Sequence, residues 1–272
     1  MSFEEVKFLF REHRIVPNKL LGQNFMIDSS VFPKLSNYAT LNAQDTVLDA
    51  GAGFGFLTRF LADKCKSVVA VEKDQHVAMV LREQVRGLPN VTLIEGDVLK
   101  AKIPSFNKAI SIPPYYLSSQ LVTWLLDRGF GCVVLIVQKE FADRLVAAVG
   151  SENYGWLTVV TQQAAEAELL DDVPKWMFYP QPPVDSITLR MKPWQIPPFT
   201  VKDKAFFRRL TKWLFTQRNK KLENAIAPFI RSELKLDKAE AERIAATVPQ
   251  RERRVRELAP KDFGAIADAL SK

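Results

Sequence analysis

The feature that most constrains this chain is a glycine-rich turn between an apolar segment and a helical pattern. The stretch TVLDAGAGFGFLTRF, residues 46–60, begins with strand-forming residues and passes through Asp49. Three glycines then alternate with other residues, at Gly51, Gly53 and Gly55. Because glycine has no Cβ, the backbone there can turn tightly and approach a ligand closely. The helix that follows presents free N–H groups at its start, so the stretch predicts a ligand-facing strand–turn–helix unit of an α/β protein.

The spacing of these glycines distinguishes two kinds of ligand site. In the nicotinamide-cofactor fingerprint the third glycine comes three residues after the second, whereas here it comes two residues after it. The D-x-G-x-G-x-G spacing, with Asp49 as its acid, resembles the S-adenosylmethionine (SAM) loop of class I methyltransferases. SAM carries a cationic sulfonium and an amino-acid end, both suited to nearby carboxylates. An ordinary strand-to-helix turn is the alternative, and we favour the SAM loop over it.

Acidic residues also follow the next two predicted strands. The segment SVVAVE, residues 67–72, reads as a buried parallel strand that ends on Glu72, and Asp97 ends the strand pattern within 91–99. An acid after the second strand can accept hydrogen bonds from both ribose hydroxyls of an adenosyl group, and Asp74 is the less favoured substitute for Glu72. Asp97 is placed to accept from the adenine amino group. Any one carboxylate could be a solvated loop end, but three after successive strands favour one shared site.

The rest of this region predicts a mostly parallel sheet with helices on both faces, because strand patterns alternate with helical ones. Further strands are expected at 108–112, 132–137, 157–163 and 186–191, and helices at 1–16, 29–39, 75–85, 121–126 and 141–149. The last two strand patterns are joined by a loop, which predicts an antiparallel edge. The expected fold class is α/β, a Rossmann-like class I methyltransferase sheet with a small C-terminal helical domain.

A proline-rich stretch divides the chain. The segment KPWQIPPF, residues 192–199, contains three prolines, so it can sustain neither a helix nor a central strand. We therefore expect a SAM-binding catalytic domain over 1–192, a linker over 193–199 and a helical domain over 200–272. The helical domain should contain helices at 202–217, 218–231, 237–247 and 260–270.

Composition narrows the class of protein further. The chain has 272 residues, of which 47% are hydrophobic, and no apolar run approaches the roughly 20 residues of a membrane helix, so a cytoplasmic protein is expected. Cys65 and Cys132 lie far apart in apolar segments, which predicts buried thiols. With only two histidines besides, we expect no metal site. No exposed apolar seam is evident, so a monomer is expected.

Positive charge gathers in the C-terminal part of the chain, and the net charge is +7. Its clusters are Arg208, Arg209 and Lys212; Arg218, Lys220 and Lys221; and Arg251, Arg253, Arg254 and Arg256. Such runs on helices are often solvated faces. Because phosphate contacts dominate nucleic-acid binding, repeated basic clusters on a small appended domain are as consistent with nucleic-acid contact as with solvated faces.

Together these segments resemble the rRNA adenine N6-dimethyltransferase family from about Asn18 to Phe263. The matching pieces are NKLLGQNFMID (18–28), LDAGAGFGFLT (48–58), AVEKD (70–74), EGDVL (95–99), PPYYLSS (113–119), VQKEFADRL (137–145), YGWLTV (154–159), FYPQPPVDS (178–186), QRNKKLENAI (217–226) and RELAPKDF (256–263). The resemblance implies SAM-dependent methylation of two adjacent adenines near the 3′ end of small-subunit rRNA during ribosome assembly. Sister groups methylate large-subunit rRNA or act as mitochondrial transcription factors; the acidic N-terminal segment disfavours the latter.

The resemblance also assigns roles to residues. The SAM-binding set it implies is Gln23, Asn24, Met26, Asp49, Gly51, Gly53, Glu72, Lys73, Asp97, Val98 and Ser111. The RNA is implied to cross a cleft between the two domains. Its phosphates would be contacted by Arg144, Arg218, Lys220 and Lys221.

The family's catalytic motif, Asn-(Leu or Ile)-Pro-Tyr, is altered here. Its Asn side chain and the carbonyl before Tyr accept hydrogen bonds from the adenine amino group, while Tyr stacks on the base. This chain reads Ile112-Pro113-Pro114-Tyr115, so Tyr115 can stack and the Pro114 carbonyl can accept, but Ile112 offers no acceptor.

Three hypotheses follow from this departure. Ser111 or a water supplies the acceptor and adenine is still methylated; or the target is another base or atom; or the protein binds SAM and rRNA as an assembly factor. The intact cofactor elements favour the methyltransferase.

Overall fold

The computed structural model describes residues 3–18 and 22–271, and the chain divides into two compact units. The first unit combines the chain up to Ala142 with Ala167–Pro193. The second unit combines Asp143–Glu166 with Trp194–Lys272. The second unit therefore takes in a helix from within the sheet region as well as the C-terminal helices.

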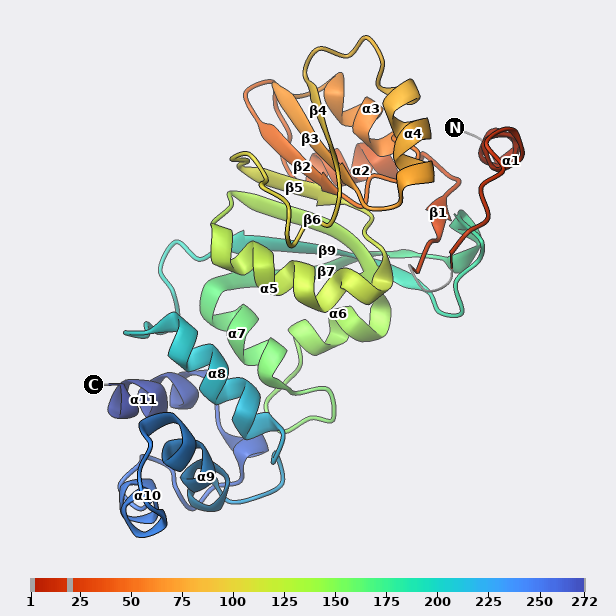
Figure 1. Ribbon diagram of the computed structural model, residues 1–272. Coiled ribbons are helices and arrows are strands. Elements are labelled where there is room, and N and C mark those ends of the chain that lie inside the picture. Colours follow the sequence, from red (N-terminus) through yellow and green to blue (C-terminus); the bar gives the residue numbers. More distant parts are fainter. Residues whose placement is uncertain (1–2, 19–21, 272) are drawn as a thin grey trace. The chain divides into compact units, whose positions relative to one another are not determined.

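The first unit is built on a sheet that has seven strands within the described residues, in the order β4-β3-β2-β5-β6-β9-β7 (Figure 1). Their bounds are β2 Thr46–Ala50, β3 Ser67–Glu72, β4 Val91–Glu95, β5 Lys108–Ser111, β6 Cys132–Gln138, β7 Ala165–Val173 and β9 Ser186–Pro193. Strands β4, β3, β2, β5 and β6 pair in parallel, and β9 pairs antiparallel with β6. The chain runs outward from β2 through β3 to β4, then returns to the other side of β2 as β5.

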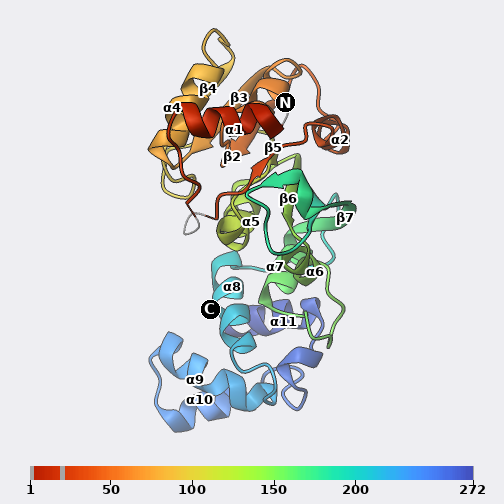
Figure 2. The ribbon, with the colours of Figure 1, turned by 90° about the vertical axis from the view of Figure 1, so that its right-hand side faces the viewer.

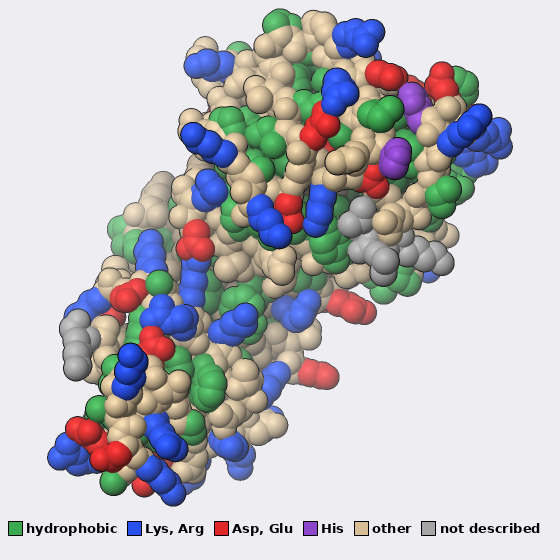
Figure 3. Space-filling view, viewed as in Figure 1, with side chains coloured by type: hydrophobic (Ala, Val, Ile, Leu, Met, Phe, Trp, Pro, Cys, Tyr) green, Lys and Arg blue, Asp and Glu red, His purple; other side chains and the backbone are tan. Residues whose placement is uncertain are grey.

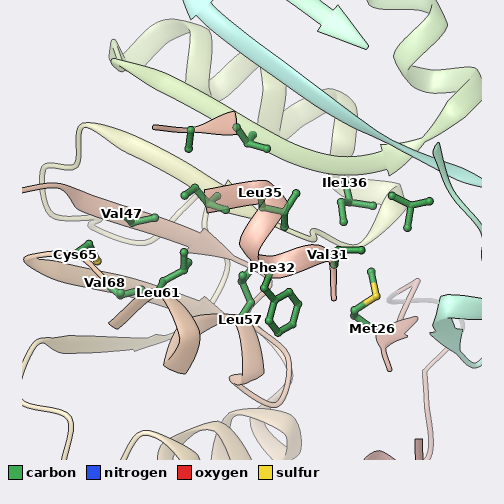
Figure 4. Packing of buried hydrophobic residues seen from close by; sticks show 14 of the residues in the cluster. Met26, Val31, Phe32, Leu35, Val47, Leu57, Leu61, Cys65, Val68 and Ile136 are labelled. Atoms are coloured by element: carbon green, nitrogen blue, oxygen red, sulfur yellow. The ribbon is translucent and has the colours of Figure 1, made fainter. Parts of the chain in front are cut away.

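Helices connect these strands and bury their apolar faces on the sheet. They are α2 Val31–Tyr38, α3 Phe56–Ala62, α4 Gln75–Gln84, α5 Ser118–Arg128 and α6 Lys139–Leu145. The main core joins α2 and α3 to one face of the sheet, where Phe32, Leu35 and Leu61 meet Val47 and Val68 (Figure 4). The central strands β2, β3, β5 and β6 are buried along nearly their whole length, as expected for parallel strands that are covered on both faces.

A short N-terminal assembly lies beside the sheet. Helix α1, Phe3–Glu12, packs Val6, Leu9 and Phe10 into a cluster that includes residues of α4 (Figure 2). Strand β1, Phe25–Met26, pairs antiparallel with β8, Phe178–Tyr179. This pairing joins the N-terminal segment to a loop more than 150 residues later in the chain.

The second unit is helical. It contains α7 Trp156–Ala164, α8 Lys204–Phe215, α9 Leu222–Leu234, α10 Lys238–Ala245 and α11 Pro260–Leu270. Helices α7, α8 and α11 pack together, and α9 packs against α10. The buried Tyr154 hydroxyl donates to the carbonyl of Leu258 at 2.7 Å, which fixes the α7 end to the segment before α11.

The predicted fold class is confirmed, but the strand predicted at 157–163 is wrong, because these residues belong to helix α7. Periodicity cannot distinguish a short buried strand from a helix that is buried on most sides, and Leu157 through Thr161 are all buried. The strand next to β9 is instead the acidic segment AEAELLDDV. A sheet edge tolerates such charges, and here Arg190 of β9 donates to Glu168 of β7.

Several helix boundaries also differ from the predictions: α1 ends at Glu12, before the predicted 16, and α5 spans Ser118–Arg128 instead of 121–126. Helix α6 ends at Leu145, before the predicted 149. Helix α9 begins at Leu222 instead of 218, because Lys221 forms an antiparallel bridge with Arg254. Within the described residues, no helix is long and apolar enough to cross a membrane.

Candidate active site at the carboxyl edge of the sheet

A pocket opens where β2 and β5 end, at the point where the strand order reverses. Crevices at such switch points are the usual ligand sites of open α/β sheets. The space there amounts to about 960 Å³ when the open solvent at its mouth is included. Its walls come from the N-terminal segment and from the ends of four strands. The predicted residues among them are Gln23, Asn24, Met26, Asp49, Gly51, Gly53, Glu72, Lys73, Asp97, Val98, Ile112 and Pro114.

The glycine turn forms the floor of this pocket and requires glycine. Gly51, Gly53 and Gly55 have φ of 78°, 57° and 86°, which side chains other than glycine rarely adopt. A Cβ on Gly51 would lie 2.5 Å from Cδ of Pro114, and one on Gly55 would lie 2.5 Å from Cδ1 of Leu81. The turn therefore fits directly against the Pro-Pro segment after β5.

Asp49 is a buried acid at the end of β2. Its Oδ2 accepts a hydrogen bond from the Thr58 hydroxyl at 2.7 Å. The pKa of Asp49 is raised to about 7, chiefly by burial and in part by the nearby Glu72 carboxylate, while the Thr58 hydrogen bond opposes the shift. A cation in the pocket would favour the ionised form of Asp49, so this acid is suited to a positively charged ligand.

Glu72 holds the loop around it as well as facing the pocket. Its Oε2 accepts from the Gly53 N–H at 3.0 Å, and its Oε1 accepts from the N–H groups of Lys73 and Asp74, each at 2.9 Å. Burial raises the pKa of Glu72, and these three hydrogen bonds oppose that shift. Asp74 itself caps α4 by accepting from the N–H groups of His76 and Val77, so it has a structural role.

Asp97 and Lys73 form an ion pair at the next strand end. The Lys73 Nζ lies 3.2 Å from Oδ2 of Asp97, and Oδ1 accepts from the Leu99 N–H at 3.0 Å. Burial alone would raise the pKa of Asp97, but these two partners lower it overall. Asp97 therefore stays an ionised hydrogen-bond acceptor at neutral pH.

The N-terminal segment closes one side of the pocket. Nε2 of Gln23 donates to Oδ2 of Asp74 at 2.9 Å, and Nδ2 of Asn24 donates to the Gly22 carbonyl at 3.1 Å. The Phe25 ring lies against Gly53 and stacks on Phe54. Part of the family-like stretch 18–28, residues 19–21, lies outside the described residues.

The altered motif follows β5 directly. Ser111 is fully buried, its Oγ accepting from the Ala50 N–H at 2.8 Å and donating to the Leu48 carbonyl at 3.3 Å. Ile112 lines the pocket and packs against the main core cluster. The Pro114 carbonyl accepts from the Leu117 N–H at 2.9 Å.

Tyr115 contacts β9 and β8 through its hydroxyl and its ring. Its hydroxyl lies 2.6 Å from Oγ of Ser186 on β9, and its ring meets the Phe178 edge at 6.3 Å. Burial raises the pKa of Tyr115, so the phenol stays neutral. Neither Ser111 nor Tyr115 lines the pocket. Tyr116 does line it, although the sequence did not predict this residue as part of the site.

The predicted RNA-contacting residues of the second unit lie where two basic segments meet. The Lys221–Arg254 bridge places residues 218–222 beside 251–256. Figure 3 shows Lys and Arg side chains gathered over the α8–α10 region. Arg218 donates to the carbonyls of Ser151 and Glu152, both at 3.0 Å.

The other three predicted contacts differ in their surroundings. Lys221 pairs with Glu252 at 2.8 Å, and Lys220 is exposed. Arg144 lies in the last turn of α6, where its carbonyl accepts from the Thr158 hydroxyl at 2.5 Å.

Within the described residues, no group of three His, Cys, Asp or Glu side chains is arranged to hold a metal ion.

Known proteins match this chain over most of its length. The family model "Ribosomal RNA adenine dimethylase" matches residues 16–262. The probable ribosomal RNA small subunit methyltransferase A of Thermococcus kodakarensis is 38% identical over 263 residues, covering 96% of this chain and 92% of the relative. The corresponding Methanosarcina mazei protein is 36% identical over 250 residues, covering 91% of each chain. A dimethyladenosine transferase structure from Plasmodium falciparum has a TM-score of 0.74 and 25% identity, covering 89% of this chain and 95% of that one.

Proposed function

Because this chain belongs to the ribosomal RNA adenine dimethylase family, we propose that it transfers methyl groups from SAM to N6 of adenine in small-subunit rRNA. The observation that carries the proposal is the convergence of Asp49, Glu72 and Asp97 with the glycine turn and Pro114 in one pocket. We place the target at two adjacent adenosines near the 3′ end of that rRNA, in an immature small subunit in the cytoplasm.

The pocket residues fit SAM by their chemistry. The Gly51 backbone packs directly against the Pro114 ring, which is possible only because Gly51 has no Cβ, and this contact brings the glycine turn and the Pro-Pro segment to the same pocket. Buried Asp49 suits the cationic end of SAM, and Glu72 keeps about one of its four lone-pair positions free for a ribose hydroxyl beyond its three backbone hydrogen bonds. Asp97 remains an ionised acceptor for the adenine amino group. When bound, SAM supplies an electrophilic methyl group on its sulfonium.

The target amino group needs help from the protein, because its lone pair is delocalised into the adenine ring. Acceptors near the amino group draw the nitrogen towards tetrahedral geometry, and an aromatic ring holds the base in place. Tyr115 has its ring fixed by Ser186 and Phe178, so it is preorganised for stacking. The remaining contribution is in-line positioning of nucleophile and methyl group in a site of fixed charges.

The Ile112 position bears on how fast this chemistry runs. The Ser111 hydroxyl is engaged with both Ala50 and Leu48, which weighs against its use as the missing side-chain acceptor. The Pro114 carbonyl accepts one hydrogen bond from Leu117 and retains a second lone pair. We infer that the backbone, with or without a water, carries the acceptor role here.

For the RNA, we propose that residues 200–272 form the main rRNA-binding region. Its contacts would be Arg218, Lys220 and Lys221, with Arg144 contributing as well. The side-by-side placement of 218–222 and 251–256 supports this, since it concentrates cations that are distant in sequence.

The experiment is transfer of labelled methyl groups from SAM to small subunits isolated from cells lacking this gene. Wild-type protein should label adenine N6, and Tyr115→Ala should abolish labelling while retaining RNA binding. Tyr115→Phe keeps the ring but loses the Ser186 hydrogen bond, so it should retain partial activity. A wild-type protein that binds the particle but neither binds SAM nor transfers methyl groups would refute the proposal.

A further inference from the structure

Tyr115 and Tyr116, which follow the Pro-Pro segment, have different neighbours. Tyr115 contacts Ser186 and Phe178 and does not line the pocket. Tyr116 lines the pocket and keeps 47% of its surface exposed. The short helical turn Tyr115–Leu117 separates the two rings in this way.

The neighbours of Tyr116 belong to one end of the pocket. Burial of the Tyr116 ring raises the pKa of its hydroxyl, the Lys73 ammonium opposes that shift, and the Asp97 and Glu72 carboxylates add to it. These groups follow β3 and β4, the strand ends assigned above to the ribose and the adenine of the cofactor. A Cβ built on Gly22 would lie 3.3 Å from Cδ1 of the Tyr116 ring, so the N-terminal segment packs against the ring.

The Tyr116 ring therefore lines the pocket with Gly22 of the N-terminal segment packed against it. Gly22 has φ of 55° and can approach the ring only because it lacks a side chain. Val98 and Leu117, both buried, complete an apolar wall of the pocket next to the polar pair Lys73–Asp97. An apolar wall with an aromatic ring and a few polar groups at its rim matches the chemistry of a purine nucleoside.

We propose that Tyr116 is a cofactor-contacting residue whose ring covers the adenosyl end of the pocket. This rests on the proposed function, because it takes SAM as the ligand. Aromatic contact with a base is worth about 1–3 kcal/mol by alanine substitution, which corresponds to roughly a 5- to 140-fold change in affinity. The role differs from that of Tyr115, which is assigned to the target base.

The test is calorimetric titration of the full-length protein with S-adenosylhomocysteine. Tyr116→Ala should weaken binding about fivefold or more, whereas Tyr116→Phe, which keeps the ring, should stay within about twofold of wild type. Trp176→Ala is the matched control, since Trp176 is 60% exposed in the same unit and does not line the pocket; it should bind like wild type.

A second ligand localises the contact. Methylthioadenosine has the adenosyl group but no amino-acid end, so Tyr116→Ala should lose the same fold in affinity for it. Equal binding of S-adenosylhomocysteine by wild type and Tyr116→Ala would overturn the inference, as would a loss confined to RNA binding or a loss absent with methylthioadenosine. Failure of wild type itself to bind either ligand would instead refute the proposed function.

Discussion

At the scale of single residues, Ile112 has the greatest bearing on the rate of methyl transfer, because it removes a side-chain acceptor for the target amino group. It occupies the motif position where a side-chain amide is expected, and its own side chain packs into the core cluster with Met26 and Phe32. The nearest hydroxyl, on Ser111, is already bonded to the backbone of β2. The acceptor lost at position 112 is therefore not replaced by its neighbour in the chain.

This arrangement predicts that Ile112→Asn speeds methyl transfer. A lost preorganised hydrogen-bonding group typically costs about 10²–10³ in rate, and restoring an acceptor in a site not refined for it should recover roughly tenfold. The measurement is single-turnover labelling of small subunits at saturating SAM. Ile112→Ala removes the same apolar contact without adding an acceptor, so it should not be faster than wild type. If Ile112→Asn is no faster than Ile112→Ala, a side-chain acceptor at this position does not limit the rate.

Residue types at strand ends were predictable, but their partners were not. The acids Asp49, Glu72 and Asp97 follow from the strand pattern, and all three line one pocket. That Tyr115 faces Ser186 while Tyr116 faces the pocket depends on a single helical turn after Pro114 and on a strand far along the chain. No local pattern distinguishes the two tyrosines.

At the scale of elements, helix α1 supports the pocket without lining it. Its Phe10 ring meets Phe25 at 5.1 Å, Phe54 at 5.1 Å and Tyr179 at 5.6 Å. Phe25 in turn lies against Gly53 of the glycine turn. These contacts hold strand β1 against the glycine turn, and with it the adjoining pocket residues Gln23 and Asn24.

Phe10→Ala should therefore loosen α1 and weaken cofactor binding together. Truncating a buried Phe costs about 3–5 kcal/mol of packing, and here part of that loss should appear as local opening of the N-terminal segment. Hydrogen exchange should speed up over residues 3–12, and affinity for S-adenosylhomocysteine should fall several-fold. Phe8 of the same helix is 59% exposed, so Phe8→Ala should change neither quantity. Faster exchange with unchanged affinity would mean that α1 anchors only itself.

The elements also show where sequence patterns are ambiguous. The central parallel strands were predictable because each is a continuous apolar run that ends on a polar residue. The segment Leu157–Gln163 is also rich in β-branched residues, yet it belongs to helix α7, and because Leu157 through Thr161 are all buried no polar face shows its helical period. The strand that was missed, β7, is acidic, and only its position beside β9 and Arg190 explains it.

At the scale of the whole molecule, the two units divide the chemistry. The pocket belongs to the first unit, while the bridge between 218–222 and 251–256 belongs to the second. The sequence shows both basic clusters but not their contact, which depends on the path of the chain between α9 and η4 Val255–Glu257. The Arg218 guanidinium already donates hydrogen bonds to the carbonyls of Ser151 and Glu152, so part of its hydrogen-bonding capacity is used within the protein.

Lys220 and Lys221 are thus the sharper test of RNA binding by the second unit. Lys220 is exposed, and Lys221 carries only an exposed ion pair with Glu252, which contributes little and is readily exchanged for a phosphate. Each phosphate contact contributes roughly 0.7–0.9 to the slope of log affinity against log salt. Lys220→Ala with Lys221→Ala should therefore weaken binding to the small-subunit RNA and lower that slope by about 1 to 2.

The charge-matched control is Lys64→Ala with Lys66→Ala. These lysines are exposed and lie between α3 and β3, at the amino edge of the sheet in the first unit, far along the strands from the pocket. The control removes the same two charges, so it lowers any contribution of net charge equally while leaving the bridge intact. If both double variants flatten the salt dependence alike, the protein attracts RNA through its overall positive charge. A slope lowered only by the Lys220–Lys221 change would assign phosphate contacts to the bridge of the second unit.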